Sequence, residues 1–323
     1  MPRAMRIHET GGPDKLTWEE IEVGAPGPGQ VRVRNTAIGL NFVDIYRRRG
    51  LYPMPLPFIA GSEGAGVVEA VGPKVKEFKV GDRVAYAGPL GAYAEVVLPP
   101  ADRLVKIPAG VDDKTAAAML LKGLTAQYLI RRTYRVKKGD TILMHATAGG
   151  VGQILCQWAK HLGATVIGTV GSDAKAAIAK KLGCKHVIVT PCENFVERVK
   201  EITKGKGVPV VYDSVGKDTF MGSLDCLTPL GILVSCGNAS GAVTQFNPGV
   251  LAQKGSLYLT CPMLATYTAT REDLVKAARE LFAVVKSGKV KISVNQTYPL
   301  SEAAQAHRDL EARKTTGSTV LLP

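Results

Sequence analysis

The chain has 323 residues, 46% of them hydrophobic and 21% charged, which is an ordinary globular composition with enough length for two separate cores. No apolar run approaches the roughly 18 to 20 residues of a membrane span, and no signal-peptide, peroxisomal or lipidation motif is visible, so we expect a cytoplasmic protein without membrane contact. The formal net charge of +13 permits nonspecific binding of nucleic acid, but the basic residues are spread out and no nucleic-acid recognition module accompanies them.

Residues 1 to about 110 contain short apolar segments separated by glycine and proline at intervals of 8 to 12 residues. This spacing is typical of a small antiparallel barrel or sandwich rather than of βαβ units. The alternating pattern VRVR near residue 31 supports a half-buried strand. We expect strands at 30–37, 66–71, 83–86 and 92–98.

The period changes to a helical one at residues 116–130, which marks the expected domain boundary. From 141 to about 260, strand-like and helix-like segments alternate, and this alternation predicts an α/β domain built on a doubly wound parallel sheet. The remaining residues, with a helix near 271–287 and strands at 290–298 and 319–322, are expected to return to the first domain. We expect the sheet strands at 141–145, 164–170, 186–189, 208–213, 231–236 and 256–260, and helices near 173–182, 192–203 and 217–227.

Residues 139–160, GDTILMHATAGGVGQILCQWAK, place a strand, a glycine turn and a helix in direct succession. Gly149, Gly150 and Gly152 let the backbone turn tightly, so that a pyrophosphate can approach the positive end of the helix dipole. A second expected strand completes a βαβ unit of the usual length. The segment therefore predicts dinucleotide binding; the alternative is that the glycines only allow tight packing of the helix on the sheet.

Several short motifs along the whole chain match one known family. They are Gly139-Asp140, Leu143, Gly149-Gly150-Val151-Gly152, Gln157 and Lys160, Asn41-Phe42-Val43-Asp44 with Tyr46, Gly50-Leu51-Tyr52-Pro53, Leu121-Lys122-Gly123-Leu124-Thr125, Tyr212-Asp213-Ser214-Val215-Gly216 and Gly237-Asn238-Ala239-Ser240-Gly241. With these motifs the chain resembles the zinc-independent quinone oxidoreductase and zeta-crystallin branch of the medium-chain dehydrogenase/reductase superfamily, and most closely the bacterial-type NADPH:quinone oxidoreductases. The resemblance implies a GroES-like β-barrel catalytic domain at 1–122 and 266–323 and a Rossmann NADPH-binding domain at 123–265.

The resemblance also implies roles for individual residues. Asn41, Tyr46, Tyr52 and Thr125 would lie near the nicotinamide in a cleft between the domains, and Asp44 is a further candidate for organising hydrogen bonds to the acceptor. Two expected cofactor positions depart from the family pattern: Thr190 stands where tyrosine is frequent and Cys236 where phenylalanine is common. The other expected cofactor contacts are Ala148, Gly149, Gly150, Val151 and Gly152 at the pyrophosphate, Gly171, Ser172 and Lys175 at the adenosine ribose and its phosphate, and Ser214, Asn238 and Arg313 along the strand ends.

The second strand of the βαβ unit predicts a preference for NADPH over NADH. An NAD-specific site usually places Asp or Glu about 20 residues beyond the glycine turn, to bind the ribose 2′-hydroxyl. Residues 169–172 contain no carboxylate, and Lys175 stands where its ammonium can reach a 2′-phosphate. Two alternatives stay open: Asp173 would disfavour the phosphate if it turned inward, and Lys175 is otherwise a solvated helix residue.

We expect no metal centre. Zinc-dependent members of the superfamily need cysteine and histidine ligands in the barrel, whereas Asn41 and Ser62 occupy the matching positions and Glu63 alone cannot hold a catalytic metal. The six cysteines all lie at or beyond residue 156 and have no CxxC spacing. Buried free thiols are therefore expected rather than disulfides or a metal cluster.

Without a metal, the expected substrate is one that accepts hydride readily from NADPH, such as a quinone. Two alternatives remain: an NADPH-dependent reductase of α,β-unsaturated carbonyl compounds, and an RNA-binding, zeta-crystallin-like protein that keeps NADPH as a ligand. We also expect a homodimer, because the last strand of the sheet, at 256–260, would otherwise leave an exposed edge.

Overall fold

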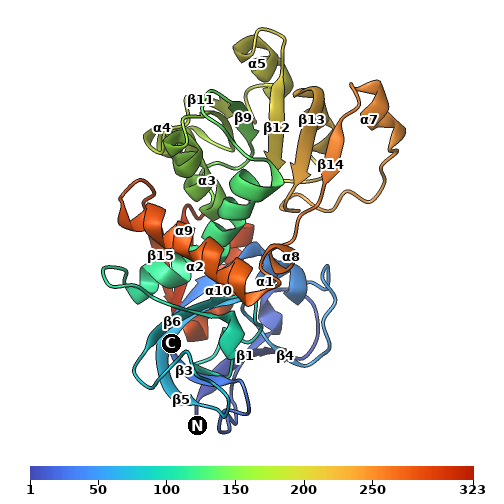
Figure 1. Ribbon diagram of the computed structural model, residues 1–323. Coiled ribbons are helices and arrows are strands. Elements are labelled where there is room, and N and C mark those ends of the chain that lie inside the picture. Colours follow the sequence, from blue (N-terminus) through green and yellow to red (C-terminus); the bar gives the residue numbers. More distant parts are fainter. The chain divides into compact units, whose positions relative to one another are not determined.

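The computed structural model describes all residues from 1 to 323, and they form two compact units (Figure 1). The first unit comprises Met1–Leu124, Thr268–Lys286 and Ile292–Pro323, and the second comprises Thr125–Tyr267 and Ser287–Lys291. The short segment 287–291 therefore belongs to the second unit although the chain on both sides of it belongs to the first. None of the helices is long and apolar enough to cross a bilayer.

The first unit is built on two sheets. A three-stranded sheet has the order β2-β1-β4, and a seven-stranded sheet has the order β15-β16-β3-β5-β6-β8, with β7 paired to β3. All pairs are antiparallel except β15 with β16. The strands are β1 (Arg3–Ile7), β2 (Leu16–Glu20), β3 (Val31–Leu40), β4 (Phe58–Ile59), β5 (Glu63–Val71), β6 (Arg83–Ala87), β7 (Val96–Val97), β8 (Leu104–Lys106), β15 (Val294–Pro299) and β16 (Ser318–Leu322).

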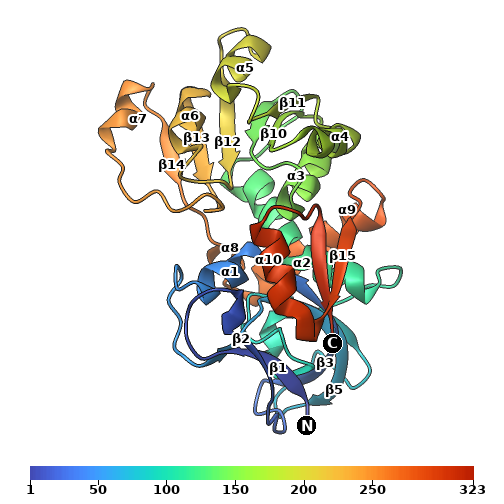
Figure 2. The same ribbon diagram turned by 180° about the vertical axis from the view of Figure 1, so that it is seen from behind.

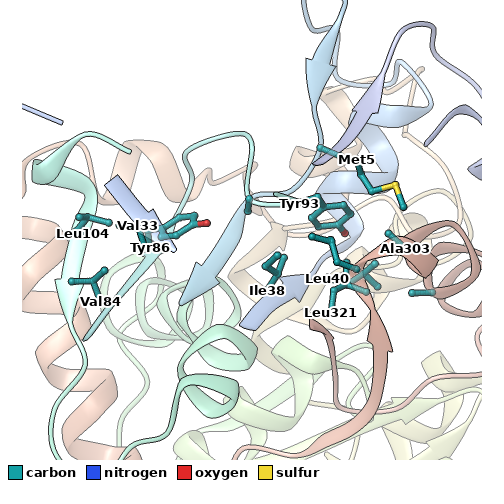
Figure 3. Close-up of a cluster of buried hydrophobic side chains, with 14 of the residues drawn as sticks. Met5, Val33, Ile38, Leu40, Val84, Tyr86, Tyr93, Leu104, Ala303 and Leu321 are labelled. Carbon is teal, nitrogen blue, oxygen red and sulfur yellow. The ribbon is translucent and has the colours of Figure 1, made fainter. Parts of the chain in front are cut away.

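Helices accompany these sheets, and α10 contacts β15, which Figure 2 shows from behind. The core between them contains Met5, Ile38, Leu40, Tyr93 and Leu321, all at most 2% exposed (Figure 3). Alternating residues of β3 face this core, as expected for a half-buried strand. The helices are α1 (Phe42–Arg48), α2 (Asp113–Tyr128), which continues into the second unit, α9 (Arg271–Lys286) and α10 (Ala303–Glu311).

The strand expected at 92–98 is wrong in extent, because only Val96–Val97 forms a strand there. The physical reason is the buried side chain of Asn35, whose Nδ2 donates hydrogen bonds to the carbonyl oxygens of Ala92 (3.1 Å) and Ala94 (2.8 Å). The Asn35 side chain thus takes the place of backbone partners on one side of this segment, and on the other side only an isolated bridge joins Ala94 to Ala4 of β1. The strands expected at 30–37, 66–71 and 83–86 are present, and the first two extend further than predicted.

The second unit contains a six-stranded parallel sheet in the order β11-β10-β9-β12-β13-β14. The order reverses between β9 and β12, which is the position where doubly wound sheets bind their ligands. The predicted fold class is confirmed. The elements are β9 (Thr141–Met144), α3 (Gly150–His161), β10 (Thr165–Val170), α4 (Asp173–Lys181), β11 (His186–Val189), α5 (Phe195–Ile202), β12 (Val208–Asp213), α6 (Phe220–Asp225), β13 (Leu227–Ser235), α7 (Gly249–Gln253), β14 (Tyr258–Thr260) and α8 (Leu264–Tyr267).

The central strands of this sheet are almost entirely buried, because helices cover a parallel sheet on both faces. Helix α6 is shorter than the expected segment 217–227, since the Asp213 carboxylate accepts hydrogen bonds from the N–H groups of Val215 (2.9 Å) and Gly216 (3.0 Å) and holds the preceding loop. The edge strand β14 is partly exposed, with Tyr258 at 60%. Helix α10 was not predicted.

Candidate functional site

The glycine turn follows β9 and begins α3 at Gly150. Thr147 fixes the turn by donating two hydrogen bonds to Thr169 O, from its N–H (3.1 Å) and from its Oγ1 (3.0 Å). A Cβ atom on Gly152 would lie 2.5 Å from the carbonyl oxygen of Ala146, so only glycine fits this conformation. No side chain caps α3 and its first turn contains no acidic residue, so the helix end suits an anion.

A second group of predicted residues lies at the ends of β10 and β11. Around the Cβ position of Gly171 there is open space to at least 4 Å. Ser172 caps the N-terminus of α4, and its Oγ accepts a hydrogen bond from the Lys175 N–H (3.4 Å). Lys175 is half-buried, whereas Asp173 is exposed. Thr190 donates to Val170 O from its N–H (3.0 Å) and its Oγ1 (3.2 Å), which ties the two strand ends together.

Ser214 directly follows β12, and Cys236 directly follows β13. A buried polar network lies next to these two residues. The Asp213 carboxylate, which is 0% exposed, accepts hydrogen bonds from Ser223 Oγ (2.8 Å) and from the loop that follows β12. Ser223 Oγ in turn lies 3.0 Å from His145 Nε2. Burial lowers the pKa of His145, and burial with the neighbouring Asp213 raises the pKa of the Cys236 thiol to about 12. Both groups are therefore neutral at physiological pH.

In the first unit, Asn41 stands at the start of α1 and is fixed by Glu63. Asn41 Nδ2 donates to Gly39 O (3.2 Å) and Glu63 Oε2 (2.9 Å), and Glu63 also accepts from Leu121 N (2.7 Å) and from Lys122 Nζ (3.1 Å). Glu63 is 0% and Lys122 6% exposed, so this is a buried ion pair. The sequence did not predict this role for either residue: Glu63 was considered only as a metal ligand, and Lys122 only as part of the matching segment 121–125.

Asp44 belongs to the first turn of α1 and is surrounded by donors. Its Oδ1 accepts from Ser62 Oγ (2.6 Å), and its Oδ2 accepts from Asn41 N (3.0 Å) and Tyr93 Oη (3.2 Å). Burial disfavours the charged form and raises the pKa of Asp44 to about 6, against the opposing effect of these donors and of Arg47. The carboxylate is nevertheless mostly ionised at pH 7.

Two predicted tyrosines form an aromatic edge next to this helix. The rings of Tyr46 and Tyr52 are 5.4 Å apart in an edge-to-face arrangement, and Phe42 lies 6.1 Å from Tyr46. Tyr52 is 38% and Phe42 37% exposed, so both rings are accessible. Such a surface suits a flat apolar ligand.

The structure brings the predicted residues together in two groups, one in each unit. The first unit holds Asn41, Asp44, Tyr46 and Tyr52, which cluster around α1, and also Arg313, just beyond α10 with a positive φ of 58°. The contacts of these residues with cofactor and acceptor stay predictions. The second unit holds Thr125 in α2, Ala148, Gly149, Gly150, Val151 and Gly152 at the turn, Gly171, Ser172, Lys175 and Thr190 at β10 and β11, and Ser214, Cys236 and Asn238 at β12 and β13.

The residues at the position of a zinc site do not fit a metal. Nowhere in the protein do three or more histidine, cysteine, aspartate or glutamate side chains come together in a way that could hold a metal ion. Asn41 supplies only a neutral amide oxygen and Ser62 Oγ already accepts a hydrogen bond from the positively charged Arg47 Nη1, so the pair does not provide the donors that zinc prefers. All six cysteines are free thiols.

Comparisons with known proteins agree with this architecture. Residues 27–109 match the alcohol dehydrogenase GroES-like domain family, and residues 150–283 match the zinc-binding dehydrogenase family. A quinone oxidoreductase of Pseudomonas aeruginosa is 56% identical to this chain over 325 residues, and the match covers 100% of both proteins. A 2-haloacrylate reductase of a Burkholderia species is 51% identical over 332 residues, and the match covers 100% of this chain and 99% of the relative.

A solved structure extends the similarity to three dimensions. The Escherichia coli quinone oxidoreductase complexed with NADPH has a TM-score of 0.98 and 51% sequence identity, covering 99% of this chain and 100% of that one. The predicted family is confirmed. The GroES-like match is followed along the chain by the zinc-binding dehydrogenase match, which is the domain order of the medium-chain dehydrogenases/reductases. The chain belongs to the quinone oxidoreductase family of this superfamily.

Proposed function

We propose that the protein is an NADPH-dependent quinone oxidoreductase that reduces its acceptor without a metal ion. The observation that carries this function is the full-length similarity to the NADPH-bound Escherichia coli quinone oxidoreductase, at 51% identity and a TM-score of 0.98. The glycine turn supports this function, because the uncapped N-terminus of α3 can bind an anion such as the pyrophosphate. NADPH supplies the hydride, and the protein supplies binding and orientation.

The second unit has the features needed for the cofactor. The turn 148–152 holds the pyrophosphate, the open space at Gly171 leaves room for the adenosine ribose, and Lys175 pairs with the 2′-phosphate. Asp173 is exposed to solvent, so its carboxylate is not buried against the 2′-phosphate and does not repel it at close range. The flanking contacts in this unit come from Thr125, Thr190, Ser214, Cys236 and Asn238. We assign the NADPH-binding domain to this unit, which covers the predicted segment 123–265 except its first two residues.

The first unit has the features needed for the acceptor. Tyr46 and Tyr52 present an accessible aromatic edge against which a quinone ring can stack. Asn41 and Asp44 fix the start of α1 and so hold Tyr46 in place. We therefore assign the catalytic domain to the first unit, which differs from the predicted segments 1–122 and 266–323 by including 123–124 and lacking 266–267 and 287–291.

A second candidate is reduction of α,β-unsaturated carbonyl compounds, which the 51% identical 2-haloacrylate reductase favours. Steady-state NADPH oxidation with 1,4-benzoquinone, with acrolein and with 2-chloroacrylate, at equal enzyme concentration, separates the candidates. We expect the quinone to give the highest kcat/KM by at least roughly tenfold, about 1.4 kcal/mol of transition-state discrimination. A higher kcat/KM for either unsaturated carbonyl compound would assign the protein to the second class. The RNA-binding alternative has only the charge of +13 in its favour.

We further propose that the protein is a cytoplasmic homodimer. The edge strand β14 pairs only with β13, which leaves one side of its backbone without a neighbouring strand, and Tyr258 on it is 60% exposed. Pairing with the same strand of a second copy across a two-fold axis would cover this edge. Light scattering at micromolar concentration is expected to give twice the chain mass of 34.3 kDa, and a value of one chain mass would contradict the proposal.

A further inference from the structure

A chain of buried polar side chains runs through the first unit from α10 to α1. His307 Nε2 lies 3.0 Å from Tyr93 Oη, and Tyr93 Oη lies 3.2 Å from Asp44 Oδ2. On the other side of the imidazole, Arg48 Nη1 lies 3.1 Å from His307 Nδ1. These four side chains are at most 2% exposed, and Tyr93 stands in the core shown in Figure 3. The roles assigned above use Asp44 but leave Tyr93 and His307 unexplained.

Each hydrogen bond of this chain can have only one direction. A guanidinium group only donates, so His307 Nδ1 must accept from Arg48. The neutral imidazole then carries its hydrogen on Nε2 and donates it to Tyr93 Oη, whose own hydrogen is left for Asp44. Burial and the positive charge of Arg48 lower the pKa of His307 to about 3, so the imidazole stays neutral and this direction does not change over the physiological range.

Asp44 therefore acts only as an acceptor in this arrangement. Its three contacts, Ser62 Oγ, Asn41 N and Tyr93 Oη, all donate to it. A protonated Asp44 would have to place its own hydrogen among these donors and would break at least one of the bonds. Oδ2 receives two of these bonds, one of them from Asn41 N at the start of α1, so a proton on Oδ2 loosens the helix that carries Tyr46.

The positively charged groups near Asp44 also favour its ionised form. Arg47 donates to Ser62 Oγ, and Lys122 of α2 and Arg47 both lower the pKa of Asp44. Lys122 is at the same time paired with Glu63, a second buried carboxylate. Burial is the larger effect and raises the pKa of Asp44 to about 6, so the balance between its two states lies close to physiological pH.

We propose that Tyr93 and His307 are positioning residues for acceptor reduction: they direct a hydroxyl hydrogen to Asp44, which keeps that carboxylate an acceptor at the start of α1 and so holds Tyr46 in place. The inference rests on the proposed function, because Tyr46 is assigned to the acceptor. Arg48 is the last group in this series of hydrogen-bonded side chains, and a guanidinium does not release its proton. The series therefore orients its groups and does not conduct protons. Arg48 also forms a two-bond pair with Glu311 of α10 (2.8 and 2.9 Å), which holds the other end of α1.

The test is Tyr93→Phe, which keeps the ring and removes the hydroxyl. In the wild type, kcat/KM for a quinone is expected to fall as the pH drops through about 6, because Asp44 takes up a proton. Loss of one donor favours the protonated form, so in the variant this acid limb should move up by about one pH unit. The NADPH dissociation constant should not change. Tyr298→Phe, which removes a hydroxyl bonded to Asp309 elsewhere in the unit (2.9 Å), is the control and should leave the limb in place.

A pair of variants at His307 tests the direction of the hydrogen bonds. The amide of His307→Gln can accept from Arg48 and donate to Tyr93, so it should restore an acid limb close to that of the wild type. His307→Leu can do neither and should shift the limb upward as Tyr93→Phe does. An acid limb in Tyr93→Phe that coincides with the wild type, or a loss of activity that is equal at every pH, would overturn the inference.

Thermal unfolding gives a reading that does not depend on the substrate. The pKa of Asp44 is higher in the folded protein than its ordinary value, so the folded state loses stability as the pH rises and Asp44 ionises. A still higher pKa in Tyr93→Phe makes this loss larger. The decrease in Tm of Tyr93→Phe relative to the wild type should therefore grow between pH 5 and pH 8. A decrease that is constant over this range would contradict the inference. A wild type that oxidises no NADPH with quinones would instead contradict the proposed function.

Discussion

Replacing Gly152 by alanine is expected to weaken NADPH binding by roughly 100-fold or more. The added Cβ would lie 2.5 Å from Ala146 O and 2.7 Å from Thr147 Cα, which are backbone atoms of the turn itself. No side chain can move aside to relieve this overlap, so the turn must shift and its N–H groups lose their alignment with the pyrophosphate. Each charge-assisted hydrogen bond lost in this way costs about 1.5 to 3 kcal/mol.

Titration of NADPH fluorescence measures this effect directly. Gly24→Ala is the matched control, because no atom lies within 4 Å of the methyl group it adds and its φ is not in the left-handed region. Both variants should have Tm values that show them folded at the titration temperature. A folded Gly152→Ala protein that binds NADPH as the wild type does would show that the turn does not hold the pyrophosphate.

Replacing Lys175 by alanine is expected to weaken NADPH binding roughly 10- to 150-fold and to leave NADH binding nearly unchanged. Only NADPH carries a 2′-phosphate, and one charge-assisted contact with it contributes about 1.5 to 3 kcal/mol. Lys175 is half-buried in the first turn of α4, next to the open space at Gly171 and beyond the end of β10. No carboxylate lies at that strand end to bind the ribose of NADH.

The control for this prediction is Lys180→Ala, which removes an exposed lysine from the last turn of the same helix. It has the same change in net charge and should alter neither affinity by more than a small factor. Isothermal titration with both cofactors separates the possibilities. Equal losses for NADPH and NADH in Lys175→Ala would show that the lysine supports the fold of this region and not the phosphate.

The second unit was predictable from the sequence because its signals are local. A buried parallel strand is a short apolar run, and the segment 139–160 contains a strand, a turn and a helix within one stretch of chain. The predicted segment 208–213 is β12, and the predicted segment 186–189 is β11. Helix α10 was missed because its nine residues bury only Ala303, Ala306 and His307, which is a weak apolar pattern.

The first unit was less predictable because its polar contacts join residues that are far apart in the chain. Asn35 donates to the carbonyl oxygens of Ala92 and Ala94, Glu63 is paired with Lys122, and Tyr93 contacts His307, 214 residues away in the sequence. No periodicity or motif encodes such a contact. For the same reason the sequence identified Asp44 as a candidate but gave no indication of the partners that set its protonation.

The central claim is that NADPH reduces a quinone on this protein without a metal. The most direct test is the initial rate of NADPH oxidation by 1,4-benzoquinone, before and after the enzyme is dialysed against a strong zinc chelator. The account predicts the same rate for both samples and a lower kcat/KM with NADH in place of NADPH. A rate that is lost on chelation and restored by zinc, or an absence of quinone-dependent NADPH oxidation in the untreated enzyme, would contradict it.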